Sequence, residues 1–252
     1  MQAIVNNLLT SYEKVGKGPV ILMLHGWGDN SATFKVITEA LKSKYSLILV
    51  DLPGFGRTAA PKDNWGLNEY CDFVAEFLNN INEKNIYAVI GHSNGGAIAI
   101  RGLANSIWQT NKLVLLASSG IRDNYKGRRK AQRAAAKAAK LMVAPLPKRL
   151  KSKIKKRAYK AIGSDMFVAE HMQETFKKVV TDDVLEDAQK LNIPTLLVYG
   201  ANDTATPKEY GELFHVAIKG SDLKIVDETG HFLHHENPDL INKYLIEFLG
   251  GK

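Results

Sequence analysis

GHSNGG, at residues 91–96, places a serine between glycines at the junction of two apolar runs. The run Ile86–Ile90 has the length and composition of a buried strand, and the run Ala97–Leu103 is helical in character. Glycines at both ends of the motif let the chain turn sharply and let strand and helix approach closely. The order strand, tight turn, helix therefore predicts that Ser93 stands in a strained, exposed position at the turn.

Outward from this motif, short apolar runs alternate with longer amphipathic ones. The other strand-like runs are Val20–His25, Tyr45–Asp51, Lys112–Ala117, Ile193–Gly200 and Leu223–Val226. The helical candidates lie near 32–43, 67–82, 94–106, 207–217 and 238–249. Most strand candidates lack polar alternation, which is typical of strands buried on both faces of a parallel sheet. The pattern predicts an α/β protein with a mostly parallel, doubly wound sheet.

The alternation stops between about Gly120 and Asp187, where the sequence is helical in character throughout. Residues 122–160 hold 16 of the 34 Lys and Arg residues and one of the 26 acidic residues, which leaves 18 bases and 25 acids elsewhere. We therefore expect a core domain formed by residues 1–119 and 188–252, with a helical, strongly basic insertion at 120–187. A solvated surface is the favoured interpretation of the basic charge.

The composition narrows the class of protein. The chain has 252 residues, of which 45% are hydrophobic and 24% charged, and its net charge is +8. This is a globular composition, and the single cysteine, Cys71, excludes an intramolecular disulfide framework. No apolar run approaches the roughly 20 residues that cross a bilayer, and the N-terminus does not have the pattern of a signal peptide. We expect a cytoplasmic protein.

Two downstream segments complete the chemistry that a serine nucleophile requires. A hydroxyl needs a base to take its proton, and that base needs a third group to orient it. Asp203 follows the strand candidate Ile193–Gly200, and His231 follows the last strand candidate. The order Ser93, Asp203, His231 is the order expected when the nucleophile sits at a strand-to-helix turn. Taken alone, Asp203 is equally explained as a cap of the helix that begins near Pro207.

An oxyanion that develops during attack by Ser93 needs fixed hydrogen-bond donors, each worth about 3 kcal/mol when well aimed. One candidate is the backbone N–H of Asn94, at the start of the helix. The other is the backbone N–H of Trp27, in the glycine-flanked sequence HGWGD at residues 25–29. An ordinary turn is the alternative explanation of that second segment.

Taken together, these motifs resemble the α/β-hydrolase fold family, of the serine-nucleophile type with a helical cap. The motifs occur in the family's order: HGWGD at 25–29, DLPGFGRT at 51–58, GHSNGG at 91–96, YGANDTATP at 199–207 and GHFLHHENP at 230–238. The resemblance implies Ser93 as nucleophile, His231 as general base, Asp203 as its orienter, and the Trp27 and Asn94 amides as the oxyanion hole. It also implies a cap inserted after the sixth strand, where it covers the serine.

The implied activity is that of a carboxylic ester hydrolase that needs no cofactor and works through an acyl-enzyme. Hydrolysis of a carbon–carbon bond in meta-cleavage products is an alternative for the same triad, as are thioesterase, lactonase and perhydrolase activities. The carbon–carbon branch often has Trp after the catalytic histidine, whereas this chain has Phe232. The alternative that is not an enzyme is a ligand receptor that keeps an idle triad, which means that the three residues are present but do not catalyse a reaction.

The remaining expectations concern ligands and partners. His231 and His235 are four residues apart, but no acidic or cysteine ligands accompany them, so we expect no metal site. The expected partner is a small ester-like substrate, which the basic insertion would attract if it were anionic. Peripheral contact with an anionic membrane is a less favoured alternative. Aromatic residues for base stacking are sparse in the insertion, which argues against sequence-specific binding of nucleic acid. The oligomeric state stays open.

Overall fold

The computed structural model describes residues 1–122 and 170–251. In this part of the chain the strands are β1 (Gln2–Val5), β2 (Leu8–Val15), β3 (Val20–Leu24), β4 (Ser46–Val50), β5 (Ile86–His92), β6 (Lys112–Leu116), β7 (Thr195–Gly200) and β8 (Asp222–Val226). They form one sheet in the order β1-β2-β4-β3-β5-β6-β7-β8. From β4 to β8 every neighbouring pair is parallel, and β2 is antiparallel to both β1 and β4. The prediction of a mostly parallel sheet is confirmed.

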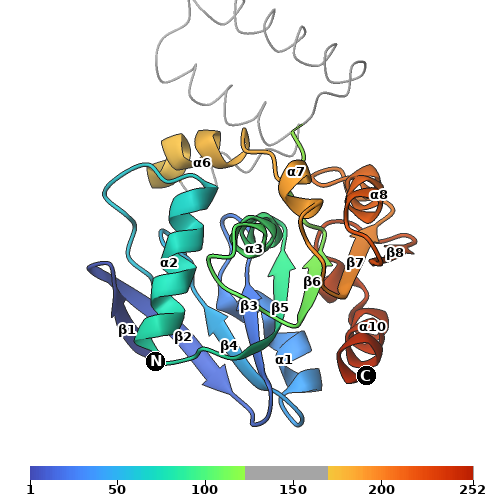
Figure 1. Cartoon of the computed structure of the whole chain (residues 1–252), viewed down its shortest axis with the longest axis horizontal. Helices are drawn as coiled ribbons and strands as arrows, with labels where there is room; N and C mark the ends of the chain where they lie inside the picture. Colours follow the sequence, from blue (N-terminus) through green and yellow to red (C-terminus); the bar gives the residue numbers. More distant parts are fainter. Residues whose placement is uncertain (123–169, 252) are drawn as a thin grey trace, which may run out of the picture.

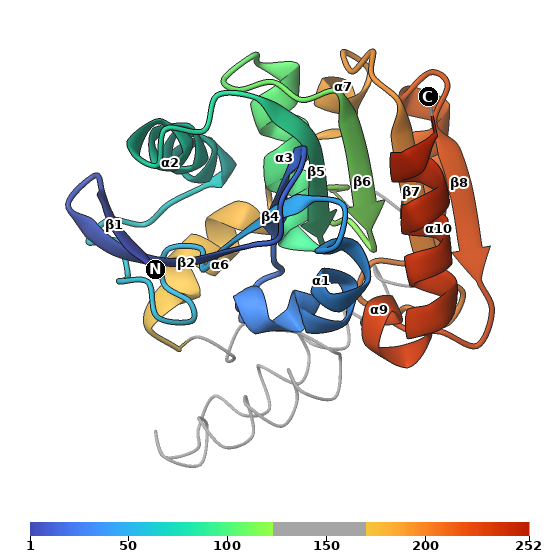
Figure 2. The ribbon, with the colours of Figure 1, turned by 90° about the horizontal axis from the view of Figure 1, so that it is seen from below.

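Helices cover both faces of the sheet (Figures 1 and 2). The described ones are η1 (Ser31–Phe34), α1 (Lys35–Leu41), α2 (Leu67–Asn80), α3 (Asn94–Ala104), η3 (Glu170–Met172), α6 (Gln173–Val179), α7 (Leu185–Ala188), α8 (Lys208–Ala217), α9 (Leu233–Glu236) and α10 (Pro238–Gly250). Apolar residues of α2, α3 and α8 form a core on one face. Those of α1, α9 and α10 form a second core on the other. The sheet is therefore doubly wound, as expected.

The central strands are buried on both sides because helices pack on each face. Every residue of β4 and β7 is buried, as is all of β3 except Val20. This explains why their sequences are apolar without alternation. The hairpin of β1 and β2, at one edge of the sheet, was not predicted. Its strands mix exposed and buried positions, so they lack the apolar run that marked the others.

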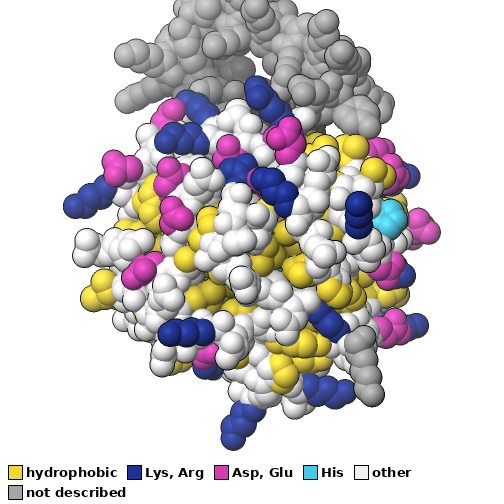
Figure 3. Space-filling view, viewed as in Figure 1, with side chains coloured by type: hydrophobic (Ala, Val, Ile, Leu, Met, Phe, Trp, Pro, Cys, Tyr) yellow, Lys and Arg dark blue, Asp and Glu magenta, His cyan; other side chains and the backbone are white. Residues whose placement is uncertain are grey.

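The insertion is predicted in the segment between β6 and β7, and most of that segment, residues 123–169, lies outside the described residues. The described remainder holds η3, α6 and α7. The insertion's predicted boundaries at 120 and 187 therefore stay a prediction. On the face of the described part in Figure 3, basic and acidic side chains are interspersed rather than segregated. No helix in residues 1–122 or 170–251 is long and apolar enough to cross a membrane.

The sheet's topology determines where functional side chains gather. The chain runs from β3 outward to β4, then crosses back to β5 on the other side of β3. The loops after β3 and β5 therefore leave adjacent strands in opposite directions, which opens a crevice at the carboxyl edge. Loops after β7 and β8 leave from the same edge. Trp27, Ser93, Asp203 and His231 all lie in loops or turns that follow these strands.

Gly95 makes this arrangement possible, and its replacement should show how strongly the fold depends on it. A Cβ at residue 95 would stand 2.0 Å from the backbone oxygen of Leu24, in β3. We expect Gly95→Ala to lower the free energy of unfolding by about 3 kcal/mol, since neither backbone can move freely. Gly250→Ala is the matched control, because a Cβ there meets nothing within 4 Å. Equal urea denaturation midpoints for the two variants would contradict the prediction.

Candidate active site

Ser93 occupies the predicted turn between β5 and α3. Its backbone angles are φ +50° and ψ −116°, a left-handed conformation that is strained for a residue with a side chain. The surrounding chain holds it there: the Ser93 N–H donates to the Leu116 carbonyl at 3.0 Å, and the Ser119 N–H donates to the Ser93 carbonyl at 3.0 Å. The backbone at the end of β6 and just after it therefore holds the turn in place.

The close approaches predicted for the glycines of this turn are present. A Cβ at Gly91 would stand 2.6 Å from the Gly96 Cα, and one at Gly96 would stand 2.3 Å from the Ser118 Oγ. Helix and strand could not pack at this distance with larger residues on both sides. The glycines thus allow α3 to begin directly after Ser93.

The loop after β3 lies against the same turn. A Cβ at Gly26 would stand 3.1 Å from the Ser93 Cβ, so the backbone preceding Trp27 passes close to the serine. Among the described residues, neither the Trp27 nor the Asn94 backbone N–H donates to a backbone or side-chain acceptor. For Asn94 this follows from its place at the first turn of α3, where amides lack an intrahelical partner. The two predicted oxyanion donors are thus free in this part of the chain.

His25 and Asp51 hold the loops beside this site in place. The His25 Nε2 accepts from the Leu52 N–H at 2.8 Å, which ties the loop after β3 to the loop after β4. The Asp51 carboxylate accepts from the Ser31 N–H at 2.8 Å and from the Arg57 N–H at 2.9 Å. All three donors are backbone N–H groups, so the His25 and Asp51 side chains hold the backbone that shapes the crevice.

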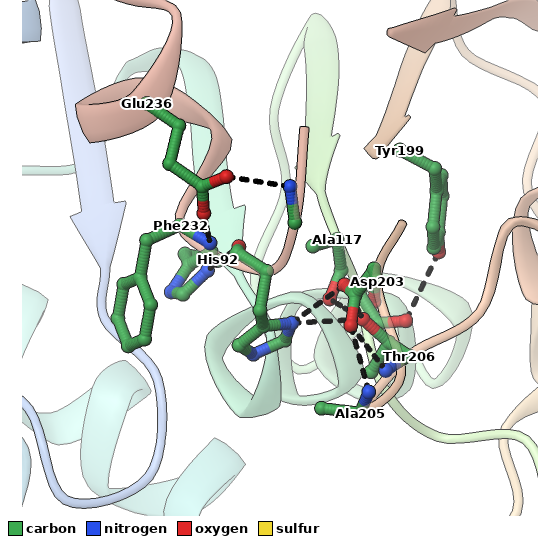
Figure 4. A network of polar contacts seen from close by, with 11 residues as sticks. His92, Ala117, Tyr199, Asp203, Ala205, Thr206, Phe232 and Glu236 are labelled. Atoms are coloured by element: carbon green, nitrogen blue, oxygen red, sulfur yellow. Dashed lines mark hydrogen bonds and ion pairs between the residues drawn. The ribbon is translucent and has the colours of Figure 1, made fainter. Parts of the chain in front are cut away.

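Asp203, in the loop after β7, contacts His231, in the loop after β8; Figure 4 shows Asp203 within this network. The His231 Nδ1 lies 2.7 Å from the Asp203 Oδ2. Close backbone packing brings the loops together, since a Cβ at Gly200 would stand 2.3 Å from the Thr229 carbonyl oxygen. The Asn202 N–H also donates to that carbonyl, at 2.9 Å. The Asp203 and His231 side chains are therefore within hydrogen-bond distance of each other.

The environment of Asp203 keeps its carboxylate ionised. Burial acts to raise its pKa, but the hydrogen bond and charge of His231 and the hydrogen bonds of Thr206 outweigh burial, so the pKa lies below its ordinary value. The Ala205 and Thr206 N–H groups donate to Oδ1 at 2.8 and 3.0 Å. An ionised carboxylate at this position can hold the imidazole with its Nδ1 protonated and Nε2 free.

Thr206 is a member of this network that the sequence did not reveal. Its Oγ1 lies 2.8 Å from the Asp203 Oδ2, 2.9 Å from the Ala117 carbonyl oxygen and 3.1 Å from the His231 Nδ1. The hydroxyl has one proton, so it donates to the carboxylate or to the carbonyl, and its lone pairs face the imidazole N–H. The available signal was its position three residues after Asp203, where Ser and Thr often close turns.

The single cysteine and the histidines that follow His231 can be placed in the structure. Cys71 is buried in α2, and burial raises the pKa of its thiol to about 12. The His234 and His235 Nε2 atoms each lie 3.1 Å from the Thr33 Oγ1. In the described ranges no three His, Cys, Asp or Glu side chains are grouped so that they could hold a metal ion.

Buried neutral histidines should make stability depend on pH. Burial is the main cause that lowers the pKa of His25, His92 and His234, the last to about 3. Below about pH 6.5, the unfolded chain takes up protons that the folded chain does not, so the free energy of unfolding falls as pH falls. Each such histidine contributes a slope of about 1.4 kcal/mol per pH unit.

We expect His234→Leu to reduce the pH dependence of the free energy of unfolding between roughly pH 4 and 6. The reduction should be about 1.4 kcal/mol per pH unit, which corresponds to one proton, whatever the effect of the substitution on stability at neutral pH. Urea denaturation at a series of pH values measures the slope. Replacement of the exposed His215 by Gln is the matched control. An unchanged slope in His234→Leu would contradict the assignment of a buried, neutral His234.

Comparison with known proteins identifies the family of the chain. A family model described as the alpha/beta hydrolase family matches residues 21–243. Among the relatives, the pimeloyl acyl-carrier-protein methyl ester esterase of Aeromonas hydrophila is 24% identical over 266 residues, which cover 95% of this chain and 99% of its own.

Solved structures with the same fold include an esterase from Exiguobacterium antarcticum (TM-score 0.78, 22% identity, 99% of each chain covered). They also include the meta-cleavage product hydrolase of Pseudomonas fluorescens IP01 (TM-score 0.76, 20% identity, 99% of this chain and 97% of that one). At these identities, the structural likeness establishes the fold alone. The family match extends over most of the chain, from β3 into α10, and the chain therefore belongs to the alpha/beta hydrolase family.

Proposed function

We propose that this protein is a serine hydrolase that cleaves carboxylic ester bonds through an acyl-enzyme intermediate. The observation that carries the proposal is the 2.7 Å contact between the His231 Nδ1 and the Asp203 Oδ2, in a chain whose Ser93 occupies a strained strand-to-helix turn. Asp203 and His231 follow the neighbouring strands β7 and β8, and Ser93 follows β5 at the same edge of the sheet. The family membership and the esterase among the relatives support the same reading.

In the proposed mechanism, the Ser93 Oγ attacks the ester carbonyl carbon while the His231 Nε2 takes the hydroxyl proton. The carbonyl oxygen becomes an oxyanion, which the Trp27 and Asn94 N–H groups stabilise. Collapse of this intermediate breaks the ester bond, and the alcohol leaves with the proton from His231. Water then attacks the acyl group with the help of His231, which releases the acid and restores Ser93.

Asp203 contributes without changing its own protonation. Its lowered pKa keeps it ionised near neutral pH, so it favours the imidazolium that forms during each proton transfer. Thr206 supports this role by directing hydrogen bonds at the carboxylate. If the Asp203 carboxylate were protonated or lacked these hydrogen bonds, the imidazole of His231 would be free to rotate and to adopt the wrong tautomer.

Steady-state hydrolysis of p-nitrophenyl esters with short and medium acyl chains tests the proposal. We expect measurable turnover in the wild type, a loss of about 10⁴-fold or more in Ser93→Ala and a loss of about 10⁴-fold in Asp203→Asn. Ser43→Ala, at an exposed serine after α1, is the matched control and should retain activity.

A parallel assay with a vinylogous diketone distinguishes ester from carbon–carbon hydrolysis. The proposal predicts faster turnover of the esters, whereas turnover of the diketone alone would replace it by the carbon–carbon activity. Folded wild-type protein that turns over neither class, and whose Ser93→Ala variant binds ligands unchanged, would instead indicate a receptor with an idle triad.

A further inference from the structure

The contact with Asp203 fixes one nitrogen of His231, but it does not fix the backbone that carries the imidazole. His231 lies in the loop between β8 and the short helix α9. Loops at a sheet edge move more readily than the strands they follow. A general base must stay within hydrogen-bond reach of the group whose proton it takes. The groups that hold the His231 loop therefore bear on the proposed chemistry.

The Glu236 side chain accepts hydrogen bonds from the backbone of this loop on both sides of His231. Its Oε2 accepts from the Gly230 N–H at 2.6 Å, and its Oε1 accepts from the Phe232 N–H at 3.2 Å. Figure 4 shows the carboxylate between these two backbone amides. The fit is close, since a Cβ at Gly230 would stand 3.1 Å from Oε1. One charged group thus bonds the residue before His231 and the residue after it.

The carbonyl of His231 itself is held from the opposite direction. The His92 Nε2 lies 3.1 Å from that oxygen, so Nε2 carries the proton and donates it. Burial lowers the pKa of His92 well below its usual range, which keeps the ring neutral with a single donor. Because His92 directly precedes Ser93, this contact links the histidine loop to the serine turn.

An ordinary helix cap does not account for the Glu236 contacts. A glutamate in the first turn commonly accepts from the N-cap amide, here that of Phe232. The shorter of its two contacts, however, is made to Gly230, which lies outside α9 and on the far side of His231. α9 has four residues, so the cap would stabilise little helix. The pair of bonds instead fixes the peptide segment that carries the imidazole.

We propose that Glu236 is a positioning residue, which holds His231 in register with Ser93 and Asp203 and acts together with the His92 contact. The inference rests on the proposed function, in which His231 is the general base. Glu236 touches neither substrate nor reacting atoms in this role. Its removal should therefore lower kcat by loosening the imidazole and leave the binding of substrate nearly unchanged.

Two variants of Glu236 test the proposal against a matched control. Glu236→Gln keeps the shape and one acceptor oxygen, while Glu236→Ala removes both acceptors. Glu247→Gln makes the same chemical change at an exposed position of α10 and serves as the control. We expect kcat for a p-nitrophenyl ester to fall about tenfold in the Gln variant and about a hundredfold in the Ala variant, with KM within about twofold.

Proton NMR supplies a readout that does not depend on turnover. A histidine N–H held by a carboxylate gives a far-downfield resonance, assigned here by its loss in Asp203→Asn. We expect this His231 signal to broaden or shift in both Glu236 variants and to stay unchanged in Glu247→Gln. Circular dichroism establishes folding, and the Gln variant alone carries the test if the Ala variant does not fold.

The outcomes separate the inference from the proposed function. Wild-type kcat and an unchanged His231 resonance in folded Glu236 variants would overturn the positioning role and leave the esterase proposal intact. If the wild-type protein does not hydrolyse esters but the His231 resonance moves as expected in the Glu236 variants, the positioning role is supported and the proposed function is overturned. A KM that rises while kcat stays constant would also overturn the inference, because it would place Glu236 in substrate binding.

Discussion

The contact between Gly95 and the end of β3 is the constraint on which the rest of the site depends. With no side chain at residue 95, the first turn of α3 packs directly on the Leu24 carbonyl, where any Cβ would stand 2.0 Å away. This packing brings the loop after β3 against Ser93 and leaves the Asn94 amide at the start of α3. The strained backbone of Ser93 is sustained by the strands around it, and a turn in an isolated peptide would relax.

The polar groups of the site fall into two classes, which are buried histidines that stay neutral and an aspartate that stays ionised. His25, His92 and His234 are buried, and burial lowers the pKa of each, so they serve as neutral hydrogen-bonding rings. Asp203 is also buried, but His231 and Thr206 keep its pKa below the ordinary value. Asp203 thus supplies a stabilised negative charge beside the imidazole that would carry a positive charge during proton transfer.

The sequence predicted the elements whose signal is local. GHSNGG and the apolar runs around it predicted the turn at Ser93, and the order of Ser93, Asp203 and His231 predicted which acid would meet which histidine. In the structure the His231 Nδ1 lies 2.7 Å from the Asp203 Oδ2. The roles of these residues in catalysis stay proposals, as does the basic insertion, most of which lies outside the described residues.

What the sequence did not predict depends on contacts between distant segments. Thr206 and Glu236 lie inside motifs that were recognised, yet their partners are decided by how the loops after β7 and β8 pack together. The hairpin of β1 and β2 was missed for a different reason. It borders the sheet, so its strands mix exposed and buried positions and lack a continuous apolar run.

The central claim is that the fold activates one serine. Reaction of the folded wild-type protein with a fluorophosphonate probe, followed by mass-spectrometric mapping of the adduct, tests that claim most directly, because the probe reacts preferentially with serines that a nearby base activates. The account predicts a single modified peptide that carries the adduct on Ser93. An adduct on another residue, or no adduct in protein shown to be folded, would contradict it.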